Sequence, residues 1–266
     1  MRASFLLLPA LLLGCRPLPE APAELDELCA YLFEHANDAP DASDPSTLTI
    51  EAGAVNLDAW LDLSMEITEE GYSVNTLSDD AVNALGDGER SLAGVKGAAV
   101  GYTSEFDLET LMQTLVTVSP ADLYPNTYLE FRRSWTGDLD CFVAGECESV
   151  TSESFATLDY TVMQAEVNSM VQYRWVDTVD FGRVAIERTW MRVPASVSVD
   201  YLTVDQQYYV WMLIPNNEGG GSRSIQATWM VATLSGGAPP EDVVLNLVVN
   251  SMTNNASLLD EWLLAE

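Results

Sequence analysis

The feature that most constrains the fold is a series of six segments with strand periodicity between residues 127 and 234. Along them Val, Tyr and Trp alternate with polar residues, as in half-buried strands. The connections between them are short and rich in Gly, Asn, Asp and Pro, so consecutive segments are expected to pair as an antiparallel meander. The six segments are 127–138, 148–161, 166–177, 183–193, 199–214 and 223–234.

A helical pattern follows this series at the end of the chain. Between Glu241 and Leu264, apolar residues recur at spacings of three and four, which predicts a long amphipathic helix. Ahead of the series, Val95–Phe106 has strand character. Two short helices are predicted to begin at Asp107 and at Ser119, where the serine is an N-cap before Pro120. Separate runs of strands and helices indicate an α+β organisation.

The stretch between residues 24 and 93 is predicted to be mainly helical. Glu24–Asn37 has an amphipathic helical pattern, and Ser78–Leu85 has a serine N-cap followed by two aspartates in the first turn. Between them, Val55–Leu61 fits either a short helix or a strand. We expect the whole segment 24–93 to pack on the domain that follows it.

The order strand, two helices, six strands and long final helix resembles the helix-grip fold of the START and Bet v 1 superfamily. The resemblance covers residues 94–266 and rests on element order, not on signature residues. It implies a curved antiparallel sheet of about six to seven strands with the final helix across it. It also implies an apolar cavity between sheet and helix that holds lipids or other hydrophobic ligands.

The first fourteen residues are predicted to be an export leader. Arg2 supplies the positive charge, and Phe5–Leu13 is an apolar run of nine residues. Such a run rises only about 13 Å as a helix, less than half of a roughly 30 Å bilayer core. Its end, Leu12-Leu13-Gly14-Cys15, resembles the lipobox of bacterial lipoproteins. An ordinary signal peptide that is cleaved near a cysteine is the alternative interpretation.

The lipobox resemblance implies that the mature chain begins at Cys15 with lipid on its thiol and a further acyl chain on its amino group. Two or more chains give stable anchoring to a membrane. Residues 15–23, with three prolines, are then a stiff tether. An Asp after the lipidated Cys would resemble an inner-membrane retention signal, and Arg16 stands there instead. The expected location is therefore the bacterial cell envelope at its outer membrane, with the leaflet left open.

The charge of the chain excludes one class of partner. There are 41 Asp and Glu against 11 Lys and Arg, a formal net charge of −30. A surface of this sign repels phosphate backbones, so no nucleic-acid partner is expected. It also repels anionic head groups, so lipid, and not electrostatic attraction, would hold the protein to its membrane.

Three further cysteines have structural interpretations. Cys141 and Cys147 flank a short loop with Gly145, and in the oxidising compartment of an exported chain they are predicted to form a disulfide. Cys29 is predicted to be a buried, unreactive thiol in a helix. His35, the single histidine, is far from the cysteine pair, and the acidic clusters lack the spacing of a calcium loop, so no metal site is expected.

Aromatic and arginine side chains in the strands are the candidate ligand-binding residues. If the aromatic residues share one face they line a concave pocket; the alternative is that they fill the core. An inward arginine fits the carboxylate or phosphate of an amphiphile. Alternatively, the arginines pair with Glu130, Glu166 and Glu187 on a solvated face. The candidates are Trp135, Tyr173, Trp175, Arg188, Trp190, Trp211 and Trp229.

Recognisable catalytic motifs are missing from the sequence, and no catalytic residue or cofactor is assigned. Our hypothesis is a membrane-anchored exported lipoprotein that binds a hydrophobic or amphiphilic small molecule without catalysis. The alternative is a structural or protein-interaction lipoprotein of the envelope with a filled core. An enzyme that uses paired carboxylates is a third possibility.

Overall fold

The computed structural model describes residues 20–36, 45–64, 71–86, 88, 90–159, 163–234 and 241–266. The predicted leader and Cys15 lie outside the described residues, as do most of the tether residues. The helices are α1 (Leu25–His35), α2 (Pro45–Ser64), α3 (Asp79–Asn83), α4 (Leu108–Thr117), α5 (Pro120–Leu123), α6 (Leu139–Val143) and α7 (Glu241–Ala265). The strands are β1 (Tyr72–Ser73), β2 (Lys96–Ser104), β3 (Tyr128–Thr136), β4 (Ser149–Asp159), β5 (Gln164–Thr178), β6 (Gly182–Met191), β7 (Ser196–Val197), β8 (Leu202–Pro215) and β9 (Ser222–Leu234).

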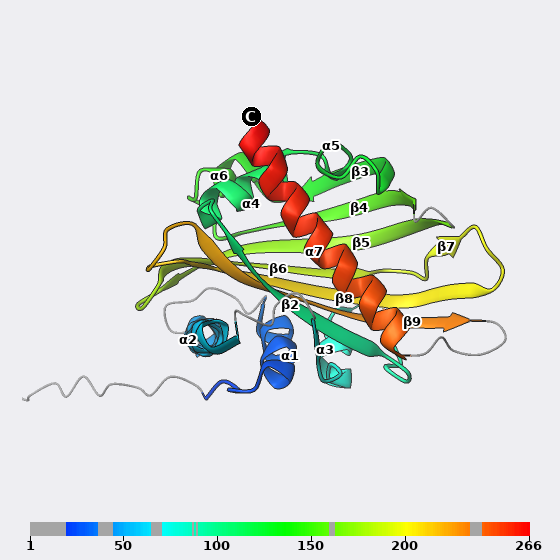
Figure 1. The fold of residues 1–266 in the computed structure, drawn as a ribbon, viewed down its shortest axis with the longest axis horizontal. Coiled ribbons are helices and arrows are strands. Elements are labelled where there is room, and N and C mark those ends of the chain that lie inside the picture. The colour runs from blue at the N-terminus through cyan, green and yellow to red at the C-terminus, as the bar shows by residue number, and fades with distance from the viewer. Residues whose placement is uncertain are drawn as a thin grey trace, which may run out of the picture.

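Within this part of the chain the strands form one 9-stranded antiparallel sheet in the order β1-β2-β9-β8-β6-β5-β4-β3, with β7 paired to β5. The predicted meander is confirmed, and the predicted long final helix crosses the sheet in front of β2 (Figure 1). The α+β fold class is confirmed as well. The strand number is higher than expected because β1 and β7 are two-residue strands that carry no periodicity.

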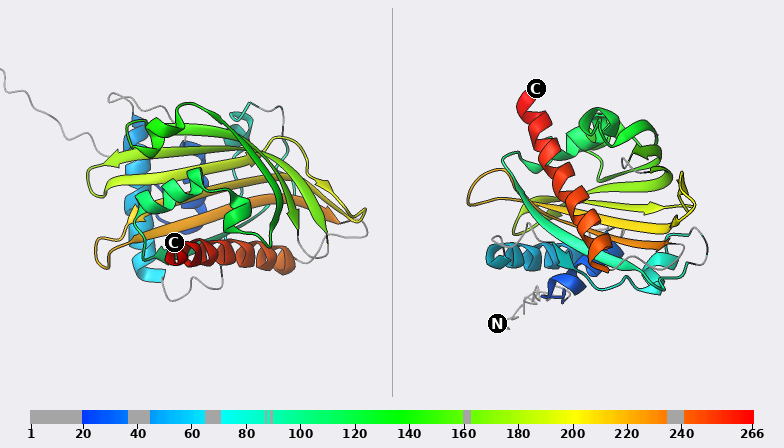
Figure 2. Two further views of the ribbon diagram at one scale, coloured as in Figure 1. Left: turned by 90° about the horizontal axis from the view of Figure 1, so that it is seen from above. Right: turned by 45° about the vertical axis from the view of Figure 1, so that its right-hand side comes forward.

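Helices cover both faces of the sheet (Figures 1 and 2). On the inner face, α4, α6 and α7 pack over a core that includes Leu111, Phe142, Leu213 and Leu259. On the outer face, α1 and α2 pack over a second core. In the central strands both sets of alternating residues therefore include buried apolar side chains. In β6, Ala185 faces inward and its neighbour Ile186 faces outward, and both are buried.

Side-chain caps begin the short helices where the sequence predicted them. The Ser78 hydroxyl accepts a hydrogen bond from the Ala81 N–H, and the Asp107 carboxylate accepts one from the Thr110 N–H. Helix α5 begins with the Ser119 cap followed by Pro120. No helix in the described residues is long and apolar enough to span a membrane.

Helix α2 is longer than the sequence indicated. It is one continuous helix where only a short helix or strand was expected around residues 55–61. Gly53 explains how it packs: a Cβ placed there would lie 2.7 Å from Leu32 Cδ2 of α1. The glycine lets the two helices approach closely. Because glycine has a low helix propensity, it also weakens the helical pattern in the sequence.

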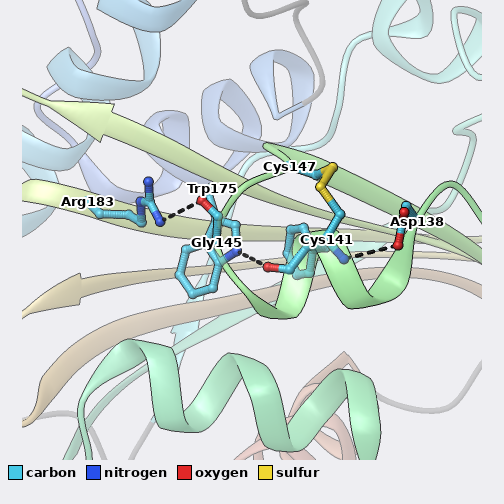
Figure 3. Close-up of a disulfide and its surroundings, with 7 residues drawn as sticks. Asp138, Cys141, Gly145, Cys147, Trp175 and Arg183 are labelled. Atoms are coloured by element: carbon cyan, nitrogen blue, oxygen red, sulfur yellow. Dashed lines mark hydrogen bonds between the residues drawn. A yellow bond between two sulfur atoms is a disulfide. The ribbon is translucent and has the colours of Figure 1, made fainter.

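The predicted disulfide between Cys141 and Cys147 is present, with 5.2 Å between the two Cα atoms (Figure 3). The first part of the segment predicted as a loop forms the short helix α6, which the Asp138 carboxylate caps by accepting from the Cys141 N–H at 3.0 Å. The residues around Gly145 form a turn, as predicted. The indole N–H of Trp175 donates to the Phe142 carbonyl at 3.2 Å. The cross-linked turn is thereby fixed to the sheet.

Candidate functional site

The structure divides the candidate ligand-binding residues between the two faces of the sheet. The inner-face core contains Trp135, Tyr173, Trp175 and Trp211. The outer-face core contains Trp190 and Trp229. Arg188 lies on the same face, because it alternates along β6 with Ile186 and Trp190 of that core. The aromatic residues therefore do not form one shared wall.

Arg188 and Trp229 make structural contacts beneath α1. The Arg188 guanidinium donates to the Phe33 carbonyl of α1 at 3.3 Å and to the Gln172 Oε1 atom at 2.7 Å. The indole N–H of Trp229 donates to the Asn75 carbonyl at 2.7 Å, and its ring meets Phe33 edge-on. These contacts fasten the N-terminal segment to the sheet.

On the inner face, one row of residues runs directly across four strands. Tyr173, Glu187, Trp211 and Gln226 are aligned in register on β5, β6, β8 and β9. Glu187 is 9% exposed, and its carboxylate accepts a hydrogen bond from the Thr189 hydroxyl at 3.0 Å. The interpretation of Glu187 as a partner for arginines on a solvated face is therefore wrong.

Three tyrosine side chains lie within electrostatic reach of this carboxyl. Tyr124, Tyr173 and Tyr209 each interact electrostatically with Glu187. Burial raises the pKa of Glu187 to about 7 and raises the pKa values of these three phenols above their ordinary range. The phenols remain protonated at neutral pH, so they can both donate and accept hydrogen bonds.

Arg133 supplies the positive charge of the cluster. Its guanidinium donates to the Leu115 and Val116 carbonyls at the end of α4, at 2.9 and 2.8 Å. It also lies over the Trp135 ring, 4.4 Å from the centroid. Attraction to Arg133 lowers the pKa of Glu187 in opposition to burial, which exerts the larger effect. Arg133 and Trp135 therefore share one face of β3.

The indole N–H of Trp211 is the unusual group in this row. Trp211 is 5% exposed, and within the described residues its Nε1 atom has no hydrogen-bond partner. The indole groups of Trp175 and Trp229 both donate to backbone carbonyls. Buried polar groups in native proteins are normally satisfied, so this unmet donor, at the strand position paired with Glu187, is a candidate contact for a ligand.

Helix α7 closes this region. Leu258, Leu259 and Trp262 pack against the inner-face core near the C-terminal end of the helix. The Asp260 carboxylate accepts hydrogen bonds from the Tyr102 hydroxyl at 3.0 Å and the Ser104 hydroxyl at 2.7 Å, both on β2. The end of α7 is thus attached to the sheet by polar contacts beside the apolar ones.

A polar hollow of about 370 Å³ lies at the end of β2, away from the Glu187 row. It is lined by residues 103–105 and by the Gly-rich β8–β9 turn. The inner face itself is closely packed, since Tyr173 and Trp211 are each 5% exposed. A ligand must therefore displace side chains or the end of α7. Among the described residues no group of three or more His, Cys, Asp or Glu could hold a metal ion.

No protein-family model and no curated protein matches the chain. Solved structures with a similar arrangement include that of Ara h 8.0201, with 14% identity, a TM-score of 0.39, and coverage of 65% of this chain and 100% of that chain. The human StarD13 (DLC2) lipid transfer and protein localization domain has 9% identity and a TM-score of 0.41, with coverage of 75% and 93%. An uncharacterized protein from Rhizobium leguminosarum has 11% identity and a TM-score of 0.36, with coverage of 65% and 96%. Likeness at this level concerns the arrangement of helices and strands alone.

Proposed function

We propose that this chain is an exported, membrane-anchored lipoprotein that binds a hydrophobic or amphiphilic small molecule between the inner face of the sheet and α7, without catalysis. The buried indole N–H of Trp211, unpartnered within the described residues, carries the binding part of the proposal. It lies in an apolar core beneath a terminal helix, where a ligand can be enclosed. The anchor rests on the sequence Leu12-Leu13-Gly14-Cys15, and the outer-membrane location on Arg16.

The geometry favours a ligand with a small polar group and a larger apolar body. The polar groups of the inner face interact with Glu187, whereas other side chains of the same core, such as Leu111, Met112 and Leu213, are apolar. Binding would replace the contacts of Leu259 and Trp262 with contacts to the ligand, so the helix would stay associated with the sheet when the site is filled.

Co-purification tests the binding proposal. The full chain is purified from the cells that export it, placed in nanodiscs of one synthetic phospholipid, and extracted with organic solvent for mass spectrometry. We expect a hydrophobic molecule that Trp211→Phe removes. Trp190→Phe is the matched control because Trp190 is also 5% exposed but lies on the outer face. An extract that holds the nanodisc phospholipid and nothing else would favour the interaction-protein alternative.

The anchor is tested separately by the mass of the N-terminal peptide. We expect the chain from the exporting cells to begin at Cys15 with acyl chains on that residue. Cys15→Ala should leave an uncleaved, unmodified precursor. A mature chain that begins at another residue and carries no lipid would show that the leader is an ordinary signal peptide and that the protein has no lipid anchor at Cys15.

A further inference from the structure

We infer that the inner-face site recognises an uncharged hydroxyl group of its ligand, which donates a hydrogen bond to the Glu187 carboxyl and accepts one from the Trp211 indole N–H. The inference rests on the proposed binding function and narrows the ligand to a neutral alcohol with an apolar body. The observation behind it is the direct pairing of the two residues across β6 and β8.

Pairing in register brings the two side chains to the same space. Residues directly opposite each other on antiparallel strands have Cβ atoms about 4.5–5.5 Å apart and share one face. Glu187 and Trp211 are such a pair, and both are at least nine-tenths buried. The inference places the polar group of the ligand between these two side chains.

The hydrogen-bonding roles of the pair define the missing group. An indole N–H can only donate, and an ionised carboxylate can only accept. The Trp211 N–H has no partner among the described residues, whereas the Glu187 carboxylate already accepts from the Thr189 hydroxyl. The group that completes both must accept at one lone pair and donate its own proton, which a hydroxyl does through one oxygen atom.

The charges around the pair argue against an ionic ligand. Glu187 and Arg133 interact electrostatically, so when Glu187 is ionised the cluster already holds one charge of each sign. A ligand carboxylate would add a second anion beside Glu187 in a buried setting, where ions of like sign repel strongly. An ammonium group would be attracted to Glu187 but has no lone pair to accept from Trp211.

Photo-crosslinking with three matched probes tests the inference. The probes are a long-chain primary alcohol, a fatty acid and an alkylamine with the same chain and the same diazirine position. Each is added to the full chain in nanodiscs, and labelled peptides are identified by mass spectrometry. We expect the alcohol to label peptides of β6 and β8 roughly tenfold more than the acid or the amine, because one buried hydrogen bond to a charged group has about that effect.

Two variants separate the polar groups of the site. Trp211→Phe should lower alcohol labelling, whereas Trp190→Phe on the outer face should leave it unchanged; a thermal melt of each confirms that it is folded. Glu187→Gln should raise acid labelling relative to alcohol, because an amide can donate to a carboxylate and carries no charge.

The outcomes distinguish this inference from the proposed function. Equal labelling by the three probes that still depends on Trp211 would keep a ligand site and overturn hydroxyl recognition. Preferred labelling by the acid or the amine, or an unchanged ratio in Glu187→Gln, would also overturn it. Absence of labelling on β6 and β8 by every probe would overturn the binding function itself.

Discussion

The Asp260 carboxylate of α7 accepts a hydrogen bond from the Ser104 hydroxyl of β2 at 2.7 Å. The same carboxylate accepts from Tyr102, so two residues of one strand hold the C-terminal part of the helix. Burial, followed by the charge of Asp260, raises the pKa of Tyr102 to about 12. These two hydrogen bonds attach the C-terminal end of α7, the helix that covers the candidate ligand site, to β2.

Asp260→Ala should lower the free energy of unfolding by about 2 kcal/mol, because both hydroxyls lose their charged acceptor. Denaturant unfolding measures this change. An ultraviolet titration should show the pKa of Tyr102 moving down toward the ordinary tyrosine value. Glu261→Ala is the control, since Glu261 is adjacent but exposed. If the two substitutions lowered the free energy of unfolding equally, the hydrogen bonds of Asp260 would not be what holds the end of α7.

Glu187 should make the stability of the protein depend on pH. Its pKa is raised from 4.5 to about 7 in the folded protein, so the folded state binds the proton more tightly than the unfolded state. The stability from this group is complete below about pH 4.5 and is lost as the pH rises through about 7, a loss of about 3 kcal/mol. Glu187→Gln should remove this slope.

The measurement is a series of denaturant melts between about pH 5 and pH 8. The matched control is Glu130→Gln, because the Glu130 side chain is 54% exposed and its substitution should leave the slope unchanged. A wild-type slope that persists in Glu187→Gln would assign the pH dependence to other carboxyls.

The meander and the final helix could be predicted because their signals are local. Alternation within each strand and the three-to-four spacing of α7 do not depend on what packs against them. The face that each aromatic residue occupies could not be predicted. Ala185 and Ile186 are neighbours that are both buried, so alternation in β6 does not distinguish the inside from the outside. The outer face is buried because α1 covers it, and that packing is a long-range contact.

Glu187 was misjudged for a related reason. In the sequence it stands beside Arg188, which suggests an exposed, paired strand position. The structure turns the two side chains to opposite faces, each under its own layer of helices. The burial of Glu187 is explained by its row, in which it pairs with Tyr173 on one side and with Trp211 on the other. That row depends on the register of the strands, which the sequence alone does not give.

Removal of the disulfide should weaken the turn at α6. For a loop of this size, the chain-entropy estimate is a loss of about 2 kcal/mol in the free energy of unfolding. Cys141→Ser combined with Cys147→Ser tests this by denaturant melts. We also expect weaker protection of the Trp175 indole N–H from hydrogen exchange, because its acceptor, the Phe142 carbonyl, lies in the cross-linked turn. Unchanged exchange would show that α6 holds its place without the cross-link.

Cys29 should be unreactive in the folded protein. Its side chain is fully buried, and burial raises the pKa of the thiol well above its ordinary value. The thiolate is the reactive form, so alkylation should be negligible under native conditions and complete in denaturant. Mass spectrometry after a timed iodoacetamide pulse gives the answer. Native alkylation at the rate of a free thiol would mean that α1 opens easily.

Arg188→Met should affect stability and leave ligand binding unchanged. The substitution deprives the Phe33 carbonyl and the Gln172 side chain of their donor, at a cost of about 2 kcal/mol. Its position on the outer face separates it from Trp211, so inner-face crosslinking should equal that of the wild type at temperatures where both are folded. A selective loss of crosslinking would move the ligand site to the outer face.

The pairing of β2 with β9 also sets a limit on when the fold can be completed. Strand β2 ends at Ser104 and its partner begins at Ser222. Helix α1 meets Trp229 of that same late strand. Strand β2 and helix α1 are therefore synthesised long before β9, the strand that both contact. A polypeptide that emerges from its N-terminus, whether from a ribosome or across a membrane, cannot enclose them until nearly the whole chain has passed.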